Sequence, residues 1–321
     1  MLQIQRLKRP SFEQVQDATK VCEQQWAYLG PMNCRMRFET LQKLGVELVL
    51  AQDGEDIQGV CFVLPDAYTD KDQSQDFVWL FQLYVIPESR NLGALMLMRM
   101  MSWYPAIMCT GVTEEAGEIY SALRWEHYDD IWRCIHPVDL NRMAEAFEGR
   151  ITSGWQRATL FLFGVIYTPV LRFFEVLVGR DVTVEILGGE VDRHEEDRSV
   201  DSIEAKLGCV ANYLEVIRIR RGHHVLTAVV LGGMGRIVED RSTGWNRVKV
   251  LCRLWLELRK KGAMLSESIA SSEKQRRAAI WFGSFPLRMP IYYWDKENRL
   301  GSFFSQIEGM NFTYSDCDKI Y

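Results

Sequence analysis

The hydrophobic residues of the first 140 positions recur with two periods. A two-residue period is typical of strands and a period of three to four residues is typical of helices, so their alternation predicts an α/β layer architecture. We expect strands at 1–9, 46–52, 57–65, 76–85, 106–112 and 129–138. We expect helices at 11–26, 37–45, 91–103 and 113–126.

Local signals support several of these elements. The pair Asp53-Gly54 between two strand-like runs favours a hairpin, because glycine tolerates the left-handed backbone of a tight turn. Gly45 is expected to end the second helix. The run 76–85 is apolar on both faces, which predicts a central strand of the sheet.

The second half of the chain repeats this order of elements in a weaker form. The expected strands are 182–189, 212–220, 224–233, 235–240, 263–270 and 288–294. The expected helices are 199–208, 242–262 and 272–284. The repeat predicts two related domains, at 1–142 and 181–321, joined by a helical bridge at 143–180.

The composition is ordinary for a soluble globular protein, with 47% hydrophobic and 25% charged residues. A net charge of −5 argues against a nucleic-acid partner, because phosphate binding needs a concentrated basic face. The eight cysteines form no C-x-x-C pair and no zinc-like spacing with histidine, so we expect reduced thiols and no metal site. The N-terminal residues lack the apolar stretch of a secretory signal, which favours a cytoplasmic location.

The segment 159–171 is almost entirely apolar. Arg157 and Arg172 enclose only about 14 residues, fewer than the roughly 20 that span a bilayer, so a transmembrane helix is not expected. Two interpretations stay open. The segment is either a helix buried between the domains and kinked at Pro169, or an apolar surface that rests on a membrane or on a partner.

The run "LYVIPESRNLGALML", residues 83–97, leads from a predicted strand through a turn into a predicted helix. Such a turn presents several backbone N–H groups in one direction, at the positive end of the helix dipole. Gly93 would let a ligand approach the backbone closely. Phosphate or pyrophosphate binding is one interpretation, and a turn that binds nothing is the other.

This run resembles the signature of the GNAT acyltransferase superfamily. In that family the strand ends in V-x-P-x-x-R, and the turn Arg/Gln-x-x-Gly-x-Gly/Ala holds the pyrophosphate of an acyl-CoA. Val85, Pro87, Arg90 and Gly93 match this pattern, whereas Leu95 stands where a small residue is usual. The side chain of Leu95 either crowds the pyrophosphate or points into the core.

A second segment, "TEEAGEIYSALRWEHY" at 113–128, is similar to the family's second motif. Ala116 and Tyr120 match that motif, and Trp125 stands in place of its phenylalanine. Arg124 replaces a glycine, and Thr113 lies about where an asparagine is usual. The second half resembles the family in the order of its elements alone, so we expect a degenerate second GNAT-like domain.

The resemblance implies α/β domains, each with a mixed, mostly antiparallel sheet flanked by helices, and direct attack of an amine on an acyl-CoA thioester. Backbone groups of Leu83 and Val85 would bind the pantetheine arm, and Tyr120 would donate a proton to the thiolate. The turn would bind the pyrophosphate. Its residues are Arg90, Asn91, Leu92, Gly93, Ala94 and Leu95.

The general base is not evident. Many acetyltransferases carry a glutamate on the strand where this chain has Phe81 and Gln82, and a glutamine side chain accepts no proton usefully. His127 and His136 titrate near neutral pH when unperturbed, but we expect each to be structural or exposed.

Two functions follow. The first is an N-acyltransferase that moves an acetyl or longer acyl group from acyl-CoA to a small amine. The second is a catalytically silent GNAT-fold protein with a binding or assembly role. The missing carboxylate and Leu95 favour the silent protein, whereas Arg90, Gly93 and Tyr120 together favour the enzyme. The acceptor and the oligomeric state do not follow from the sequence.

Overall fold

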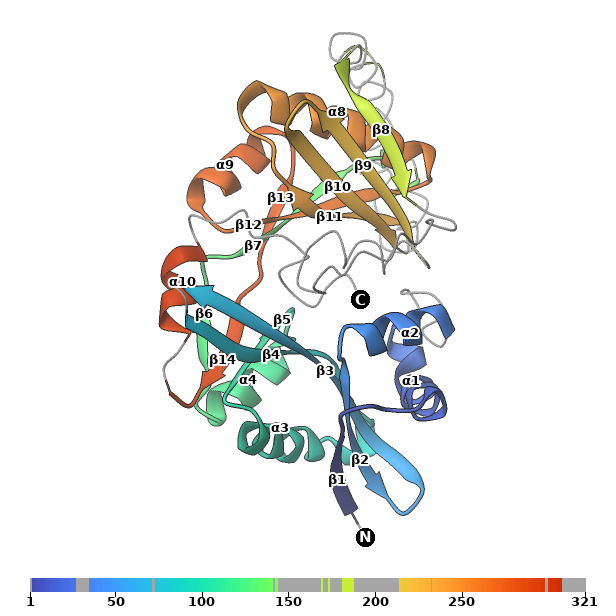
Figure 1. The fold of residues 1–321 in the computed structure, drawn as a ribbon, viewed down its shortest axis with the longest axis vertical. Helices are drawn as coiled ribbons and strands as arrows, with labels where there is room; N and C mark the ends of the chain where they lie inside the picture. The colour runs from blue at the N-terminus through green and yellow to red at the C-terminus, as the bar shows by residue number, and fades with distance from the viewer. Residues whose placement is uncertain are drawn as a thin grey trace, which may run out of the picture.

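The described part of the chain forms two mixed sheets of seven strands each, flanked by helices, in a computed structural model (Figure 1). The expected α/β architecture with two similar sheets is confirmed. The structure describes residues 2–26, 35–70, 73–140, 142–143, 169, 173, 181–187, 214–231, 233–297 and 300–307.

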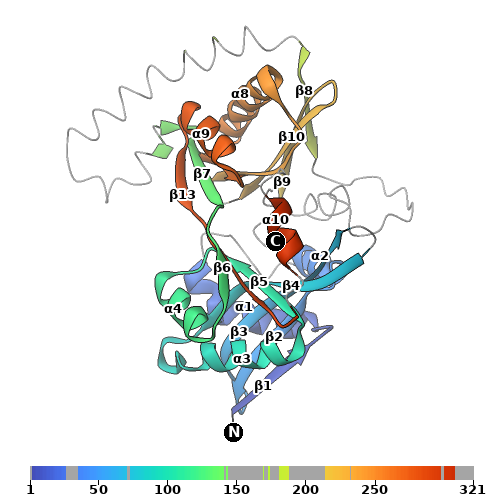
Figure 2. The ribbon, with the colours of Figure 1, turned by 90° about the vertical axis from the view of Figure 1, so that its left-hand side faces the viewer.

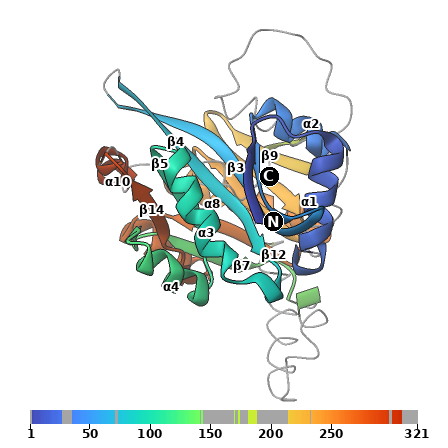
Figure 3. The same ribbon diagram turned by 90° about the horizontal axis from the view of Figure 1, so that it is seen from below.

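The first sheet has the strand order β1-β2-β3-β4-β5-β14-β6, in which only the β4–β5 pair is parallel. Its strands are β1 (Leu2–Leu7), β2 (Glu47–Asp53), β3 (Asp56–Asp70), β4 (Gln73–Val85), β5 (Ala106–Thr110), β14 (Ile291–Asp295) and β6 (Glu126–Tyr128). Helices α1 and α2 pack on one face of this sheet, and α3 and α4 pack on the other (Figure 3). Their bounds are α1 (Phe12–Trp26), α2 (Arg35–Lys43), α3 (Leu92–Trp103) and α4 (Glu114–Ala122).

The second sheet has the strand order β13-β7-β12-β11-β10-β9-β8, again with one parallel pair, β11–β12. Its strands are β13 (Phe285–Arg288), β7 (Trp132–Pro137), β12 (Leu265–Ala270), β11 (Met234–Asp240), β10 (His224–Leu231), β9 (Glu215–Arg221) and β8 (Thr183–Leu187). The helices of this half are α8 (Gly244–Lys260) and α9 (Glu273–Trp281), and α10 (Gly301–Ile307) follows β14.

The two halves exchange strands (Figure 2). Strand β7 was expected to complete the first sheet but lies between β13 and β12 of the second, and β14 lies in the first sheet between β5 and β6. Both expectations were wrong because a local hydrophobic pattern predicts a strand without identifying its distant partner. The predicted boundary at residue 142 therefore does not coincide with the division between the sheets.

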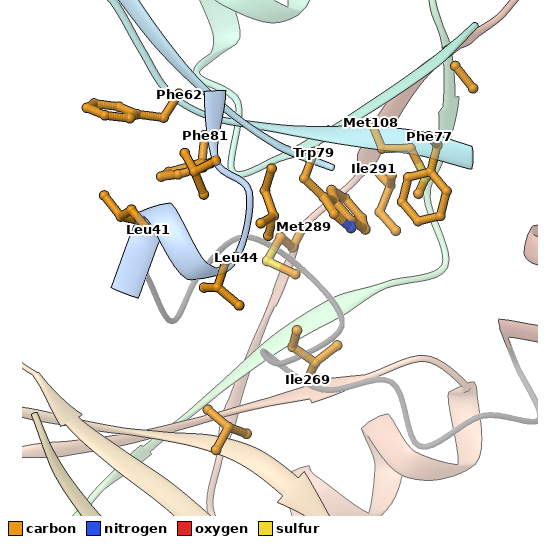
Figure 4. Packing of buried hydrophobic residues seen from close by; sticks show 14 of the residues in the cluster. Leu41, Leu44, Phe62, Phe77, Trp79, Phe81, Met108, Ile269, Met289 and Ile291 are labelled. Carbon is orange, nitrogen blue, oxygen red and sulfur yellow. The ribbon is translucent and has the colours of Figure 1, made fainter. Parts of the chain in front are cut away.

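The chain crosses between the sheets at two adjacent segments. Ile131 precedes β7 and Met289 precedes β14, and the Met289 N–H donates to the Ile131 carbonyl at 3.0 Å. Both side chains are buried in a core that the two sheets share. Trp79 of the first sheet and Ile269 of the second belong to the same cluster (Figure 4). The two halves therefore bury one continuous apolar core between them.

The apolar segment 159–171, apart from Pro169, and most of the predicted bridge lie outside the described residues, as does the predicted helix 199–208. Among the helices that the structure describes, none is long and apolar enough to cross a membrane.

Candidate functional site

The predicted strand, turn and helix at residues 83–97 are present. Strand β4 ends at Val85, a short 3-10 turn covers Pro87–Ser89, and α3 begins at Leu92. Proline fixes a φ near −65°, which suits the first position of such a turn. The turn thus directs the chain from the sheet straight into the helix.

A bulge separates the end of β4 from its neighbours. The register with β3 shifts at Val60–Phe62, and Gln82 opposite has a positive φ of 55°. Before the bulge, Val78–Leu80 of β4 pair with Ile107–Cys109 of β5. A bulge bends a strand and increases its twist, so β4 diverges from β5 beyond this point.

The divergence determines where the peptide groups of β4 point. The Ile86 N–H donates to the Gln58 carbonyl of β3 at 3.0 Å. Because successive peptide groups of a strand alternate in direction, those of Leu83 and Val85 point away from β3, toward the gap beside β5. These are the two residues that the family resemblance assigns to the pantetheine arm.

The N-terminus of α3 has no side-chain cap. Asn91 stands at the cap position in a helical conformation and makes no capping hydrogen bond, and the first turn of the helix holds no acidic residue. The Gly93 N–H donates to the Arg90 carbonyl at 3.2 Å within the turn. The helix dipole at this end attracts an anion, and Arg90 is exposed beside it.

Arg90 also lies near the start of α4. Hydrogen bonds from its own backbone and from Thr113, together with the charge of Arg90, hold the pKa of the exposed Glu115 below its usual value. Thr113 caps α4 by accepting a hydrogen bond from the Ala116 N–H at 3.3 Å. The two segments that carry the family resemblance therefore approach each other at this edge of the sheet.

Two predicted residues of the turn differ in their surroundings. Leu95 is 46% exposed, so the interpretation that its side chain points into the core is wrong. Gly93 is buried but has no positive φ, and a Cβ built on it would lie 3.8 Å from Val85 Cγ2, an ordinary contact. Neither backbone strain nor packing requires glycine at this position.

Tyr120 of α4 faces the core and is only 3% exposed. Its ring centroid is 4.6 Å from that of Trp125 and 5.4 Å from that of Tyr292 on the exchanged strand β14. Leu83 and Val85 pack against the same apolar cluster. The structure thus brings Tyr120 and the end of β4 into one cluster, which Tyr292 joins through strand exchange that no local pattern predicts.

The second half contains an equivalent strand, turn and helix. Residues 234–236 of β11 pair in parallel with 265–267 of β12, and a register shift at Thr227–Ala228 then interrupts its pairing with β10. The Arg241 N–H donates to the Val225 carbonyl at 2.8 Å, which corresponds to the Ile86 bond in the first half. Each half of the chain thus contains a bulged strand that diverges from its parallel neighbour.

The turn of the second half is less degenerate than expected. It reads Arg241-Ser242-Thr243-Gly244, which is an Arg-x-x-Gly pattern directly before α8, so the expectation of topological likeness alone was wrong. Thr243 at the cap position makes no side-chain hydrogen bond. Gly244 has a φ of 56° with open space around its Cβ direction. This signal was present in the sequence and was overlooked.

A cavity of about 30 Å³, enough for roughly two water molecules, lies between α8, α9 and the sheet in this half. Hydrogen bonds locate its counterpart in the first half. The Ser284 N–H donates to the Ala279 carbonyl and the Trp125 N–H donates to the Tyr120 carbonyl, both at 3.0 Å. Ala279 therefore corresponds to Tyr120, and Ser284 corresponds to Trp125. Small side chains leave space where the first half has aromatic rings.

The same equivalence explains a departure from the family motif. Gly283 has a φ of 79°, and Arg124 in the first half has a φ of 62°. Arg124 thus adopts the left-handed backbone conformation that the family's glycine would adopt at this position.

His136 from the exchanged strand β7 lines the cavity and is 4% exposed. Its ring stacks on Trp255 of α8, with centroids 3.6 Å apart and an interplanar angle of 6°. Burial lowers its pKa to about 3, so the imidazole is neutral near pH 7. His136 pairs with Ser266 of β12 as Tyr292 pairs with Cys109 of β5, so the two exchanged strands place a ring at corresponding positions.

The next feature of the two sites is their acidic and metal-binding side chains. Within the described ranges, no group of three or more histidine, cysteine, aspartate or glutamate side chains could hold a metal ion. Glu239 of β11 lies two residues before Arg241 and is 3% exposed, held by Thr227, Arg218 and Arg241. The first half has Tyr84 at the corresponding position.

Comparison with known proteins agrees with this geometry. No protein-family model and no curated protein sequence matches the chain. Among solved structures, a proposed acetyltransferase from Pyrococcus horikoshii is 11% identical, with a TM-score of 0.54 over 92% of this chain and 89% of its own.

Two further structures agree. A tandem GNAT protein from the clavulanic acid biosynthesis pathway is 11% identical, with a TM-score of 0.54 over 92% of this chain and 99% of its own. A conserved Enterococcus faecalis V583 protein, proposed to be an N-acyltransferase, is 10% identical, with a TM-score of 0.50 over 92% of this chain and 73% of its own. At such identities the likeness shows the fold alone. The chain therefore has the tandem GNAT fold.

Proposed function

We propose that this protein is an N-acyltransferase that moves an acyl group from an acyl-CoA to a small amine. The observation that carries the proposal is the divergence of β4 from β5 beyond the Gln82 bulge, directly before the uncapped N-terminus of α3. Exposed strand peptides and free helix amides at one edge suit a ligand with an amide-bearing arm and a diphosphate. Acyl-CoA has both parts.

The residues of the turn fit the coenzyme. Arg90 is exposed and would pair with the diphosphate, while the amides of Asn91, Leu92, Ala94 and Leu95 would line its approach. Neither the backbone conformation nor the packing at position 93 requires a glycine. A glycine there is consistent with close approach of a ligand to the backbone. The bound coenzyme would supply an activated thioester.

The arm would run along β4. The peptide groups of Leu83 and Val85 would hydrogen-bond to it and hold the thioester carbonyl in place. Tyr120 would donate a proton to the departing thiolate, because a phenol stays protonated at neutral pH. The amine acceptor would attack the thioester carbonyl directly.

The second half offers a further place for the coenzyme. The Arg241–Gly244 turn precedes α8 as the Arg90–Gly93 turn precedes α3, and a cavity lined by residues of α8 and α9 lies in the same half. Asp240 would be the carboxylate nearest this turn, since it accepts from the Ser242 N–H at 3.0 Å and contacts Arg247 at 2.8 Å.

The alternative is a catalytically silent protein of the same fold. The deep burial of Tyr120 and the absence of a carboxylate at Phe81 and Gln82 favour it. Acyl-CoA would then be a structural ligand, or the turns would bind none.

Calorimetric titration with acetyl-CoA tests the proposal. Arg90→Glu places a negative charge beside the diphosphate and is expected to weaken binding about tenfold or more, since one lost charged contact costs roughly 1.5–3 kcal/mol. Arg99→Glu, an exposed reversal further along α3, is the matched control and should bind as wild type does.

Activity separates the two functions. A Tyr120→Phe variant that binds acetyl-CoA normally but transfers the acetyl group slowly to a panel of amines would support the enzyme. Binding without any transfer by wild type would support the silent protein. An absence of binding to any acyl-CoA contradicts the coenzyme site itself.

A further inference from the structure

Large apolar side chains are exposed where α9 meets β13, the edge strand of the second sheet (Figure 2). Trp281 at the end of α9 is 89% exposed, and Ile280 beside it is also exposed. On β13, Phe285 is 65% exposed, and Leu287 two residues later is exposed as well. The Gly283 N–H donates to the Ile280 carbonyl at 2.8 Å, so a tight turn holds the two elements together. Single exposed apolar residues are common, but a cluster of four large ones indicates an interaction surface.

The same segment is basic, although the chain as a whole is acidic. Residues 271–288 carry four basic side chains and one acidic side chain, so their net charge is +3 in a chain of net charge −5. Glu273 forms ion pairs with both Arg276 and Arg277, but its single negative charge does not balance two guanidinium groups. The other two basic residues are Lys274 and Arg288. Positive charge therefore accompanies the exposed apolar cluster.

Two features argue against an added strand or a second copy of the chain on this surface. Pro286 lies within β13 and has no N–H to donate, and a proline on an edge strand hinders the pairing of a further strand. Two copies that met through this surface would also bring two net positive charges together. An anionic partner meets neither difficulty.

A membrane surface with anionic lipids fits the combination of aromatic rings and basic residues. Tryptophan and phenylalanine rings bury themselves at the level of the lipid headgroups, while lysine and arginine are attracted to anionic lipids. The ring of Trp281 protrudes almost entirely from the protein, so it enters the headgroup layer without any rearrangement of α9.

We propose that the end of α9 and the strand β13 form a docking surface for a membrane that contains anionic lipids. The aromatic and aliphatic side chains of this surface enter the headgroup region, and the basic side chains of residues 271–288 contact the lipid phosphates. This docking is independent of the acyl transfer proposed above, since none of the residues of 271–288 belongs to the two turns assigned to the coenzyme.

Cosedimentation of the full-length protein with lipid vesicles tests the docking surface. We expect the protein to pellet with vesicles that contain phosphatidylcholine and phosphatidylglycerol in equal amounts, and to stay in solution with vesicles of phosphatidylcholine alone. An absence of pelleting with the anionic vesicles overturns the proposal. Equal pelleting with both kinds of vesicle overturns it as well, because the basic residues would then have no part in binding.

Two variants locate the contact on the protein. Trp281→Ala should lower the affinity for anionic vesicles about tenfold, because the ring no longer buries apolar area among the headgroups. Lys274→Gln should lower it about fivefold, the effect of one basic residue near an anionic surface. Both side chains are exposed, so thermal unfolding should be the same as in wild type.

Trp245→Ala is the matched control, because Trp245 is also exposed but lies at the start of α8. It should pellet with anionic vesicles as wild type does. A loss of pelleting in Trp245→Ala, or unchanged pelleting of Trp281→Ala, would overturn the proposal. Sedimentation velocity without lipid tests the competing occupant. A dimer that Trp281→Ala dissociates would assign the surface to a second copy of the chain and likewise overturn the proposal.

Discussion

The turn after β4 and the turn after β11 share one backbone plan but differ in the side chains beneath them. Each follows a bulged strand, each strand diverges from a parallel neighbour, and each precedes a helix without a side-chain cap. In the first half, the rings of Tyr120 from α4 and Trp125 after it fill the space between the helix and the sheet. Ala279 and Ser284 lie at the corresponding positions of the second half. Side-chain size, rather than topology, therefore leaves a cavity at this position of the second half.

The two halves also differ on the faces that meet. The first sheet contributes large apolar residues such as Phe62 and Trp79 to the shared core. The second sheet adds buried ion pairs beside it, including Glu267, which is 1% exposed and contacts Arg133 and Arg236.

The largest expected effect tests whether the halves are one folding unit. Trp79→Ala removes a fully buried indole from the shared core and should lower the free energy of unfolding by about 3–5 kcal/mol. Because both sheets contact this core, circular dichroism and fluorescence should report one urea transition. Two separate transitions would show that the halves unfold independently despite the exchanged strands.

A swap of side-chain size tests the main contrast. Tyr120→Ala should hollow the first half and cost about 3 kcal/mol, because the surrounding rings cannot close the space completely. Ala279→Val in the second half adds two methyl groups beside the existing cavity and should cost no more than roughly 1 kcal/mol. Chemical denaturation of the two variants measures both values, and equal costs would contradict the assignment of the cavity to one half.

Acid stability should depend on His136. Its pKa is about 3 in the folded protein, against a usual 6.5, so the unfolded chain binds the extra proton between these values. Stability is therefore complete above pH 6.5 and falls as the pH is lowered, by at most about 1.4 kcal/mol per pH unit for one proton. His136→Phe should lose less stability than wild type between pH 6.5 and pH 3, as measured by urea denaturation. If the free energy of unfolding falls equally with pH in wild type and in His136→Phe, a group other than His136 causes the fall.

The smallest expected effect compares the glycines of the two turns. Gly93→Ala should stabilise the protein by about 0.4–1 kcal/mol, because its φ is not positive and a methyl group fits. Gly244→Ala should destabilise it by about 1–2 kcal/mol, because its φ of 56° is unfavourable for a residue with a side chain. Thermal unfolding gives the sign in each case, and a shared sign would contradict the difference between the turns.

The sequence predicted the local elements well and the long-range ones poorly. Strand β4 and helices α3, α8 and α9 were expected within a few residues of their bounds, because each is encoded by its own hydrophobic period. The hydrophobic pattern of β7 and β14 predicted strands but could not identify their sheets. The short strands β6 and β13 were missed, since three or four residues give no measurable period.

The candidate sites show the same limit. The residues 83–95 were predicted as a turn and helix start because the motif is contiguous in sequence. Tyr292 and His136 were not assigned to any site, because strand exchange brings each across from the opposite half of the chain. The Arg241–Gly244 turn was detectable from sequence, and comparison of the two halves at the level of single residues would have found it.

Binding of a diphosphate at the start of α3 is the central feature of the proposed function. Calorimetric titration of acetyl-CoA into wild type, Arg90→Glu and Arg241→Gln tests it most directly. We predict saturable binding by wild type, weakened about tenfold by Arg90→Glu, with the Arg241→Gln result showing whether the second turn holds coenzyme as well. Acetyl-CoA binding that Arg90→Glu leaves unchanged, or no binding by wild type, would contradict the account.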